Sequence, residues 1–379
     1  MSGVKDPASG GPVSSAPVSE VRAAAYTVPT DMPEADGTFA WDSTTIVLVH
    51  AKAGGADGLG YTYGPSALVG LVSDALAPVV VGSDAFAVPA CAEAMARALR
   101  NIGQSGAGAY AASAVDCALW DLAARLAGLP LHRLLGAARE DVPVYGSGGF
   151  TTYTDGQLSD QLGGWVADQG IPRVKIKIGQ DRGSAEQRDI ERMLAARQAI
   201  GPDAELFVDA NGAYTPKQAA RVAAAAHGAG FSWFEEPVSS ENLSGLRFVR
   251  ESISADVAAG EYLTRLADVE RMCAVGAVDC VQADVTRCGG ITGWLRAATV
   301  AQAHGVGFSG HCAPAISAAP AAAAPALRHL EWFHDHVRLE AMLFDGVLDP
   351  AGGTITPDAG RPGNGLTFKD ADAEQFRVA

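Results

Sequence analysis

From Val142 to Glu340 the chain repeats one theme, a short apolar stretch followed by an alanine-rich stretch with helical spacing. Seven or eight such repeats over roughly 200 residues predict an α/β fold with a (β/α) barrel, either complete or lacking its last helix, (β/α)7β. A doubly wound sheet remains open on periodicity alone, but the chain lacks a Gly-rich turn of the G-x-G-x-x-G type after its first strand. The predicted strands cover residues 143–148, 173–179, 205–210, 231–235, 257–260, 281–284, 307–309 and 337–340.

The first third of the chain has a different character. Two strand-like stretches flank the polar segment 30–42 ("TDMPEADGTFAWD"), and helical spacing follows in 88–101 and 110–127. We therefore expect an α+β domain over 20–136 and a barrel domain over 137–340. Residues 1–19 are rich in Gly, Ser and Pro and are predicted to be disordered.

Composition excludes several classes of function. The formal net charge of -15 and the pI near 4.9 argue against nucleic acid or an anionic membrane as the partner. No run is long and apolar enough to span a bilayer, and the six cysteines form no C-x-x-C pair. With no signal peptide visible, we expect a cytoplasmic protein with reduced thiols.

The segment "RVKIKIG" (173–179) carries two lysines on one face of a predicted strand. Side chains alternate along a strand, so Val174 and Ile176 share one face while Lys175 and Lys177 share the other. In a barrel the helices cover the apolar outer face, and both lysines then point inward near the carboxyl end of the strand, where barrel active sites lie. Two buried ammonium groups need anionic partners.

Such partners stand at the ends of the strands that follow. One acidic residue there is often a helix cap, but a Lys, His or carboxylate at seven successive strand ends is not explained by capping. The acidic and histidine residues are Asp209 (with Asn211 two positions later), Glu235 and Glu236, Glu261, Asp284, His311 and Glu340.

Three of these carboxylates predict a metal site. Asp209, Glu235 and Glu261 are spaced 26 positions apart on neighbouring strands, and converging carboxylates need a cation. Oxygen ligands with room for water and substrate favour Mg²⁺ over zinc. A lysine beside a second ammonium group and a metal has a lowered pKa and suits removal of a weakly acidic proton next to a carboxylate.

At this point the pattern resembles the enolase superfamily, in its mandelate racemase subgroup. The resemblance extends from about residue 20 to near the end of the chain and rests on "KIK", "DAN", "FEEP", "GE", "QADVTRCGGITG" and "SGHCAP", in that order. It implies a capping domain over 20–136, completed by residues 341–379, and a homo-oligomer acting on a small-molecule carboxylate. It also implies the chemistry of that superfamily, in which a Lys or His base works together with Mg²⁺.

The resemblance further implies residue roles. Lys177 would be the base, with Lys175 lowering its pKa and touching the substrate carboxylate. His311, oriented by Asp284, would be the acid/base on the opposite face. The implied Mg²⁺ ligands are Asp209, Glu235 and Glu261, and the implied substrate contacts are Lys175, Asn211 and a protonated Glu340.

The overall reaction remains open between two outcomes. In a sugar-acid dehydratase, which we favour, His311 protonates the β-hydroxyl leaving group and a 2-keto-3-deoxy acid results. In a racemase or epimerase, the second group returns a proton to the other face of a 2-hydroxy acid or amino-acid derivative. A third alternative is a barrel that binds metal and acid without turnover, or a metal-dependent aldolase or hydrolase.

The cap is expected to set specificity. Segment 30–42 and the turn "GLGYTYG" (58–64) are candidates to close over the barrel, presenting Phe39, Trp41, Tyr61 or Tyr63, of which we select Trp41 and Tyr63 as substrate contacts. For four other residues we expect structural roles: an ion pair for Glu236, a place at the rim for His336, and packing for Cys288 and Cys312.

Overall fold

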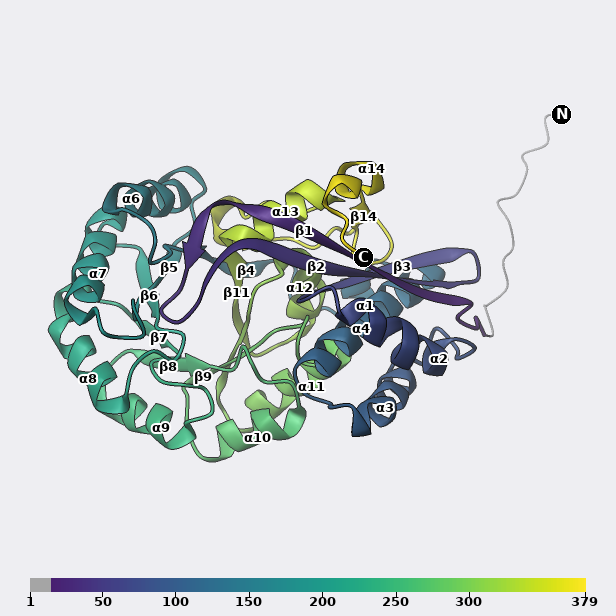
Figure 1. The fold of residues 1–379 in the computed structure, drawn as a ribbon, viewed down its shortest axis with the longest axis horizontal. Coiled ribbons are helices and arrows are strands. Elements are labelled where there is room, and N and C mark those ends of the chain that lie inside the picture. The colour runs from purple at the N-terminus through teal and green to yellow at the C-terminus, as the bar shows by residue number, and fades with distance from the viewer. Residues whose placement is uncertain (1–14) are drawn as a thin grey trace.

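The computed structural model describes residues 15–379, and the N-terminal cap is its first unit (Figure 1). An antiparallel sheet of β1 (Glu20–Ala35), β2 (Ala40–Ala53) and β3 (Ala56–Tyr63) packs on α4 (Ala107–Ala127), beside the shorter helices α1 (Leu68–Leu71), α2 (Ala77–Val80) and α3 (Val88–Ala98). The prediction of disorder in 1–14 lies outside the described residues. Residues 15–19 are placed, with Ala16 and Val18 buried, because they pack into the apolar core of the cap.

Eight parallel strands close the barrel, since β11 pairs with both β10 and β4. This confirms the predicted fold class. The strands are β4 (Val142–Gly148), β5 (Arg173–Lys177), β6 (Glu205–Asp209), β7 (Trp233–Glu235), β8 (Asp256–Ala259), β9 (Cys280–Ala283), β10 (Gly307–Gly310) and β11 (Leu327–Phe333).

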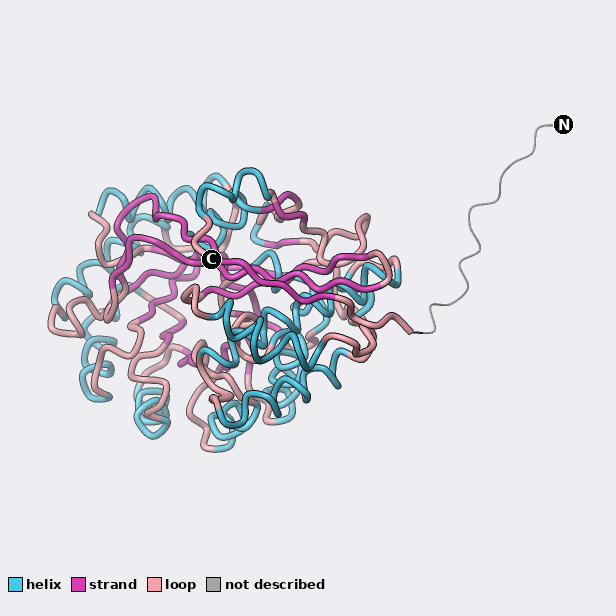
Figure 2. The backbone as a smooth tube through the Cα atoms, turned by 45° about the vertical axis from the view of Figure 1, so that its right-hand side comes forward, coloured by secondary structure: helices cyan, strands magenta, loops and turns pink. Residues whose placement is uncertain are grey.

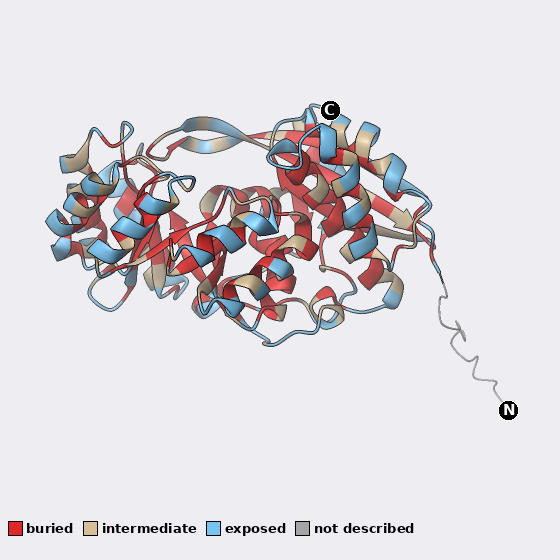
Figure 3. Cartoon of the chain, turned by 90° about the horizontal axis from the view of Figure 1, so that it is seen from below, coloured by how far each residue is buried: buried red, intermediate tan, exposed pale blue. Residues whose placement is uncertain are grey.

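Seven helices connect successive strands and form the outer ring of the barrel. Figure 3 shows buried residues along the strands and exposed residues on the outward faces of the helices. The helices are α6 (Asp155–Gly163), α7 (Glu186–Ile200), α8 (Pro216–Ala225), α9 (Leu243–Ser252), α10 (Leu266–Ala274), α11 (Gly290–Ala303) and α12 (Pro314–Ala323).

The eighth strand is the one that the sequence placed wrongly. Residues 337–340 belong to helix α13 (His334–Leu343), and the eighth strand is β11, about ten residues earlier. Polar and apolar residues alternate only weakly in segment 334–343. Leu339 and Leu343 lie four positions apart, which is helical spacing. Since both residues are buried against the main core, tertiary packing favours the helix.

The C-terminal segment runs back onto the cap. Phe344 of β12 (Phe344–Asp345) pairs with Phe368 of β14 (Thr367–Phe368), and the N–H of Val378 donates to the carbonyl of Ala25 in β1. Other short elements are α5 (Leu131–Leu134), β13 (Thr354–Ile355), which pairs with β4, and α14 (Asp370–Ala373). No helix among residues 15–379 is long and apolar enough to cross a membrane.

The β1–β2 hairpin reaches from the cap across the barrel towards β5 and α6 (Figures 1 and 2). Segment 30–42, expected as a loop, is mostly strand, because β1 runs to Ala35 and β2 begins at Ala40. The turn between them docks on the barrel: the N–H of Thr151 donates to Ala35 O, and the N–H of Arg182 donates to Gly37 O. Residues 58–64 are likewise mainly strand β3 rather than a turn.

Candidate active site at the carboxyl ends of the barrel strands

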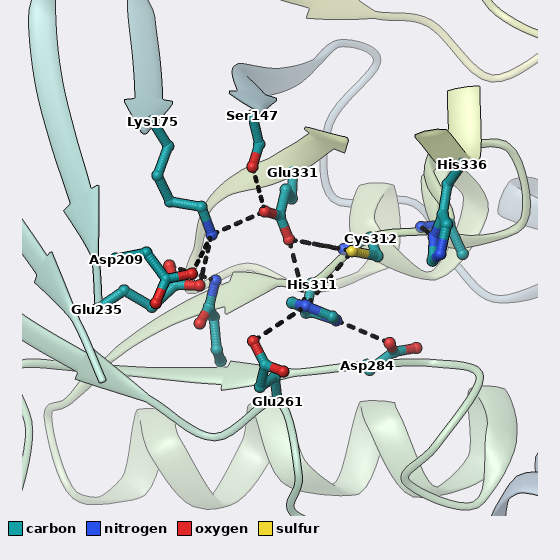
Figure 4. Close-up of polar contacts among 12 residues, drawn as sticks. Ser147, Lys175, Asp209, Glu235, Glu261, Asp284, His311, Cys312, Glu331 and His336 are labelled. Carbon is teal, nitrogen blue, oxygen red and sulfur yellow. Dashed lines mark hydrogen bonds and ion pairs between the residues drawn. The ribbon is translucent and has the colours of Figure 1, made fainter. Parts of the chain in front are cut away.

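Two buried lysines stand inside the barrel on β5. Lys175 is fully buried and Lys177 is 5% exposed, while Val174 and Ile176 face the apolar core outside, as the alternation predicts. Lys175 Nζ contacts Glu235 and lies 2.7 Å from Glu331 Oε1 (Figure 4). Lys177 Nζ donates to Asp209 Oδ2. Both ammonium groups therefore have the anionic partners that burial requires.

Burial lowers the pKa of Lys177, but the carboxylates of Asp209, Glu331 and Glu261 together outweigh burial and raise this pKa overall. The positive charge of Lys175 acts in the predicted direction, since it lowers the pKa of Lys177. The predicted lowering of the Lys177 pKa is therefore found in the effect of Lys175 but not in the overall pKa of Lys177. In this structure the facing carboxylates favour a protonated Lys177.

Asp209, Glu235 and Glu261 converge from the ends of β6, β7 and β8. All three are buried, and one oxygen from each lies within 4.8 Å of the others. Burial, with the Asp209 carboxylate adding to it, raises the pKa of Glu235 to about 8. Glu235 Oε2 also accepts hydrogen bonds of 2.9 Å each from Trp233 Nε1 and Gln282 Nε2. Three converging oxygen donors that carry negative charge fit a hard divalent cation such as Mg²⁺.

His311 follows β10 and forms a dyad with Asp284, which follows β9. His311 Nδ1 donates to Asp284 Oδ2 at 2.8 Å, while the N–H and hydroxyl of Thr286 each donate to Asp284 Oδ1 at 2.7 Å. Burial lowers the pKa of His311, but the acidic groups around it raise the pKa well above its ordinary value. The dyad therefore presents Nε2 as a proton carrier, with Nδ1–H held by a carboxylate.

Glu331, at the end of β11, is a residue that the sequence did not predict. Its Oε1 accepts from Ser147 Oγ at 2.6 Å and lies 2.7 Å from Lys175 Nζ. Its Oε2 accepts from the N–H of Cys312 at 3.1 Å and lies 3.5 Å from His311 Nε2 (Figure 4). Burial raises the pKa of Glu331, but Lys175 and His311 outweigh burial and lower it. Glu331 is thus a charged link between the lysine side and the histidine side of the site.

Glu340 lies outside the site, because it belongs to helix α13 and not to the eighth strand, where the sequence pattern predicts it. It lies on α13, accepts from Tyr61 OH through Oε1 and from the N–H of Ala315 through Oε2 at 3.2 Å. Burial raises the pKa of Glu340 to about 8, so the group is protonated near neutral pH, as expected. However, Glu340 is absent from the cavity wall, and the end of the eighth strand carries Glu331 instead.

A cavity of about 480 Å³ joins these groups to the cap. Of the predicted substrate contacts, Asn211, Trp41 and Tyr63 line it, together with Lys177, Glu261 and His311. Trp41 stacks on Phe39 and donates from Nε1 to Glu34 at 2.8 Å. The remaining wall consists mainly of Phe333, Asp335, His336, Arg287, Tyr262 and residues 43–45.

Three further residues differ from their expected roles. Glu236 is buried and has no ion-pair partner among residues 15–379, because its neighbours are Glu261 and Asp209, which with burial raise its pKa. His336 lines the cavity rather than only its rim; it stacks on Tyr63, and burial lowers its pKa to about 4. Cys312 also lines the cavity, with Sγ 3.3 Å from His311 Nε2.

Both domains match family models. Residues 20–136 match the mandelate racemase / muconate lactonizing enzyme N-terminal domain, and residues 157–373 match the enolase C-terminal domain-like family. The L-talarate/galactarate dehydratase of Salmonella typhimurium strain LT2 is 33% identical over 302 residues, which are 78% of this chain and 75% of the relative.

Solved structures are similar over nearly the whole chain. A mandelate racemase/muconate lactonizing enzyme-like protein from Rubrobacter xylanophilus is 53% identical, with a TM-score of 0.92 over 96% of this chain and 100% of its own. A racemase from Streptomyces coelicolor A3(2) with bound magnesium is 28% identical, with a TM-score of 0.89 over 95% of this chain and 100% of its own. With its cap, barrel and converging carboxylates, the chain belongs to the mandelate racemase subgroup of the enolase superfamily, whose members include lyases and isomerases that use Mg²⁺.

Proposed function

We propose that this protein removes the proton α to a carboxylate and dehydrates an acid sugar to a 2-keto-3-deoxy acid. The observation that carries the proposal is that Lys177 and His311, the latter hydrogen-bonded to Asp284, line one cavity beside the Asp209–Glu235–Glu261 set. The two proton carriers stand on β5 and β10, which are separated by β4 and β11. A substrate between them can lose a proton on one side and receive one on the other.

In the proposed reaction, Lys177 accepts the α-proton at Nζ in its neutral form, which Mg²⁺ held by Asp209 would favour because it offsets the carboxylate charge that keeps Lys177 protonated. His311 then donates a proton from Nε2 to the β-hydroxyl, which leaves as water, while Asp284 keeps Nδ1–H in place; the enol that remains tautomerises to the 2-keto acid by taking a proton at the β-carbon. Behind Lys177 and His311, Lys175 and Glu331 form an ion pair of 2.7 Å, which holds the charges next to these two groups in place. When bound to Asp209, Glu235 and Glu261, Mg²⁺ supplies positive charge that offsets the charge of the deprotonated substrate.

Two further observations support a closed site for this reaction. The turn of the β1–β2 hairpin is hydrogen-bonded to loops of the barrel, and such a cover over an active site limits the access of water. Thr44 and Asp335 both line the cavity and are hydrogen-bonded to each other, which gives this wall a polar surface that suits a polyhydroxy chain. The dehydratase among the relatives is named for the acid sugars talarate and galactarate.

A racemase is the second candidate, because Phe39, Trp41 and Phe333 give the same cavity an aromatic side that suits an apolar substituent. Incubation of the protein and Mg²⁺ with a panel of aldonic acids, aldaric acids and aromatic 2-hydroxy acids separates the two. Loss of water with formation of a 2-keto acid, detected by mass spectrometry, supports the dehydratase. Inversion of the α-carbon without loss of water, detected by NMR, contradicts it and supports the racemase.

The assembly and compartment remain predictions. We propose a homo-oligomer located in the cytoplasm, on the family resemblance and on six buried cysteines that are all free thiols. Sedimentation equilibrium tests the assembly: a mass equal to the 38.8 kDa chain contradicts the oligomer.

A further inference from the structure

A second group of metal-binding side chains lies in the same cavity, on its histidine side. His311 Nε2, Cys312 Sγ and Glu331 Oε2 are all buried and stand close together (Figure 4). Sγ lies 3.3 Å from Nε2 and 3.3 Å from Oε2, and Nε2 lies 3.5 Å from Oε2. The carboxylate set offers only oxygen, whereas this group offers nitrogen, sulfur and oxygen.

The three distances, of which the two to sulfur are hydrogen-bond contacts of the thiol in this structure, are compatible with a zinc site. Tetrahedral Zn²⁺ has bonds of about 2.3 Å to sulfur and about 2.0–2.1 Å to nitrogen or oxygen, which places neighbouring ligand atoms roughly 3.3–3.6 Å apart. The His311–Cys312–Glu331 triangle therefore matches one face of the tetrahedron. Both His311 and Cys312 also line the cavity, which leaves the fourth position to water.

The backbone conformation places the side chains of the adjacent residues His311 and Cys312 on the same side of the chain. Neighbouring side chains in extended chain point in opposite directions, so His311 and Cys312 would normally diverge. Cys312 has a φ of 50° and Ala313 a φ of 44°, both in the left-handed region that is uncommon for residues with a Cβ. This bend directs the thiol towards His311 and Glu331.

In His311 and in Glu331, the polar atom that faces away from Cys312 is bound to another residue. Asp284 binds His311 Nδ1, which leaves Nε2 towards Cys312. Ser147 and Lys175 occupy Glu331 Oε1, which leaves Oε2 with the N–H of Cys312 and a second lone pair for a metal. A carboxylate on the far nitrogen of a ligating histidine is the usual arrangement around protein-bound zinc, because it fixes the tautomer and the orientation of the ring.

We propose that His311 Nε2, Cys312 Sγ and Glu331 Oε2 form an inhibitory site for Zn²⁺ and similar thiophilic cations, separate from the Mg²⁺ ligands. Binding forms metal–nitrogen, metal–sulfur and metal–oxygen bonds, and the thiol proton of Cys312 and the Nε2 proton of His311 both pass to solvent. The positive charge of the nearby Lys175 repels a cation bound at this site. The negative charge of Glu261, whose Oε2 lies 3.2 Å from His311 Nε2, attracts it. An occupied site blocks the Nε2 atom that donates the proton in the proposed reaction.

The test is a titration of the whole protein with ZnCl₂ in saturating Mg²⁺, followed by calorimetry. We expect one zinc ion to bind per chain without release of Mg²⁺. Cys312→Ser should weaken zinc binding at least about tenfold, since it removes the only soft ligand. Cys273→Ser, which alters another buried thiol on α10, should leave the affinity unchanged.

A second measurement does not depend on a variant's folding. Co²⁺ added to the Mg²⁺-loaded wild-type protein should give the near-ultraviolet absorption of a cobalt–thiolate bond. Zinc that binds only by displacing Mg²⁺, an affinity unchanged in Cys312→Ser, or cobalt without thiolate absorption would each overturn the proposal. None of these readouts requires a substrate, so failure here is distinguishable from failure of the dehydratase proposal.

Discussion

Glu331 connects the two halves of the active site at the scale of single residues. Through one oxygen it holds Lys175 and through the other it faces His311 and the N–H of Cys312. Removing its charge leaves Lys175 paired, among residues 15–379, with Glu235 and Asp209, which are proposed to bind the metal. A change at Glu331 should therefore disturb metal ligands, acid and base together.

Glu331→Gln should lower kcat by about 100-fold or more, because a neutral amide cannot orient the Lys175 ammonium and the His311 imidazole at once. Glu340→Gln is the matched control, since Glu340 is also a buried glutamate but is absent from the cavity wall. Steady-state kinetics on a substrate found in the acid panel measures both. Equal losses in the two variants would contradict the assignment of Glu331 to the site.

Glu235→Gln should weaken Mg²⁺ binding at least about tenfold, because one of three anionic oxygen donors becomes neutral. Glu205→Gln is the control, since Glu205 is exposed, begins β6 at the far end of the barrel and pairs with Arg173. Isothermal titration calorimetry with MgCl₂ measures both affinities. An unchanged Glu235→Gln titration would remove this residue from the ligand set.

The sequence predicted those site residues that follow clear strand patterns. Lys175 and Lys177 alternate with apolar residues, and each carboxylate of the metal set ends an apolar run. Glu331 was missed because "LRHLEWF" does not alternate between polar and apolar residues, whereas the later segment "HVRLE" also ends in glutamate and completes the expected number of strands. The site geometry at Cys312 was not predictable, since it depends on a positive φ that sequence alone does not reveal.

At the scale of secondary-structure elements, the β1–β2 hairpin is what joins cap to active site. The sequence predicted strands on either side of segment 30–42, but not their continuation through it, because polar residues on an edge strand over a cavity resemble a loop. Only 36–39 form the turn, and Gly37 lies where a Cβ would meet Ile178 O at 2.6 Å and Gly179 O at 2.8 Å.

Gly37→Ala should displace this turn, since both contacts are backbone carbonyls that cannot rotate away. We expect kcat/KM to fall by up to about 100-fold through misplacement of Trp41 and Phe39 in the cavity wall. Gly70→Ala is the control, because nothing lies within 4 Å of a Cβ there. Kinetics and limited proteolysis within 36–39 test this. Wild-type values for Gly37→Ala would show that the hairpin does not shape the site.

At the scale of the whole molecule, cap and barrel share buried polar contacts. Trp120 Nε1 donates to Thr292 Oγ1 at 2.9 Å, and Tyr61 of the cap donates to Glu340 of α13. The barrel could be predicted from its repeated pattern, and the cap from the change in character near residue 136. The hydrogen bond between Tyr61 and Glu340 could not be predicted from the sequence, because the two residues are 279 positions apart.

Glu340 should make stability depend on pH. Burial raises its pKa from the ordinary 4.5 to about 8. A raised pKa in the folded state gives stability that is present below about pH 4.5 and is lost as the pH rises through about 8. Between pH 5 and pH 9 the free energy of unfolding of wild type should therefore fall by a few kcal/mol relative to Glu340→Gln, at about 1.4 kcal/mol per pKa unit. Urea unfolding at both pH values tests this, and a constant difference would contradict it.

The central claim is that Lys177 removes the α-proton and that the His311–Asp284 dyad acts afterwards. The most direct test is incubation of a substrate with Mg²⁺ in D₂O, with hydrogen exchange at the α-carbon followed by NMR. Lys177→Met should lose exchange while still binding Mg²⁺, and His311→Asn should keep exchange but lose elimination of water. Exchange retained in Lys177→Met, or elimination at the normal rate in His311→Asn, would contradict the assignment.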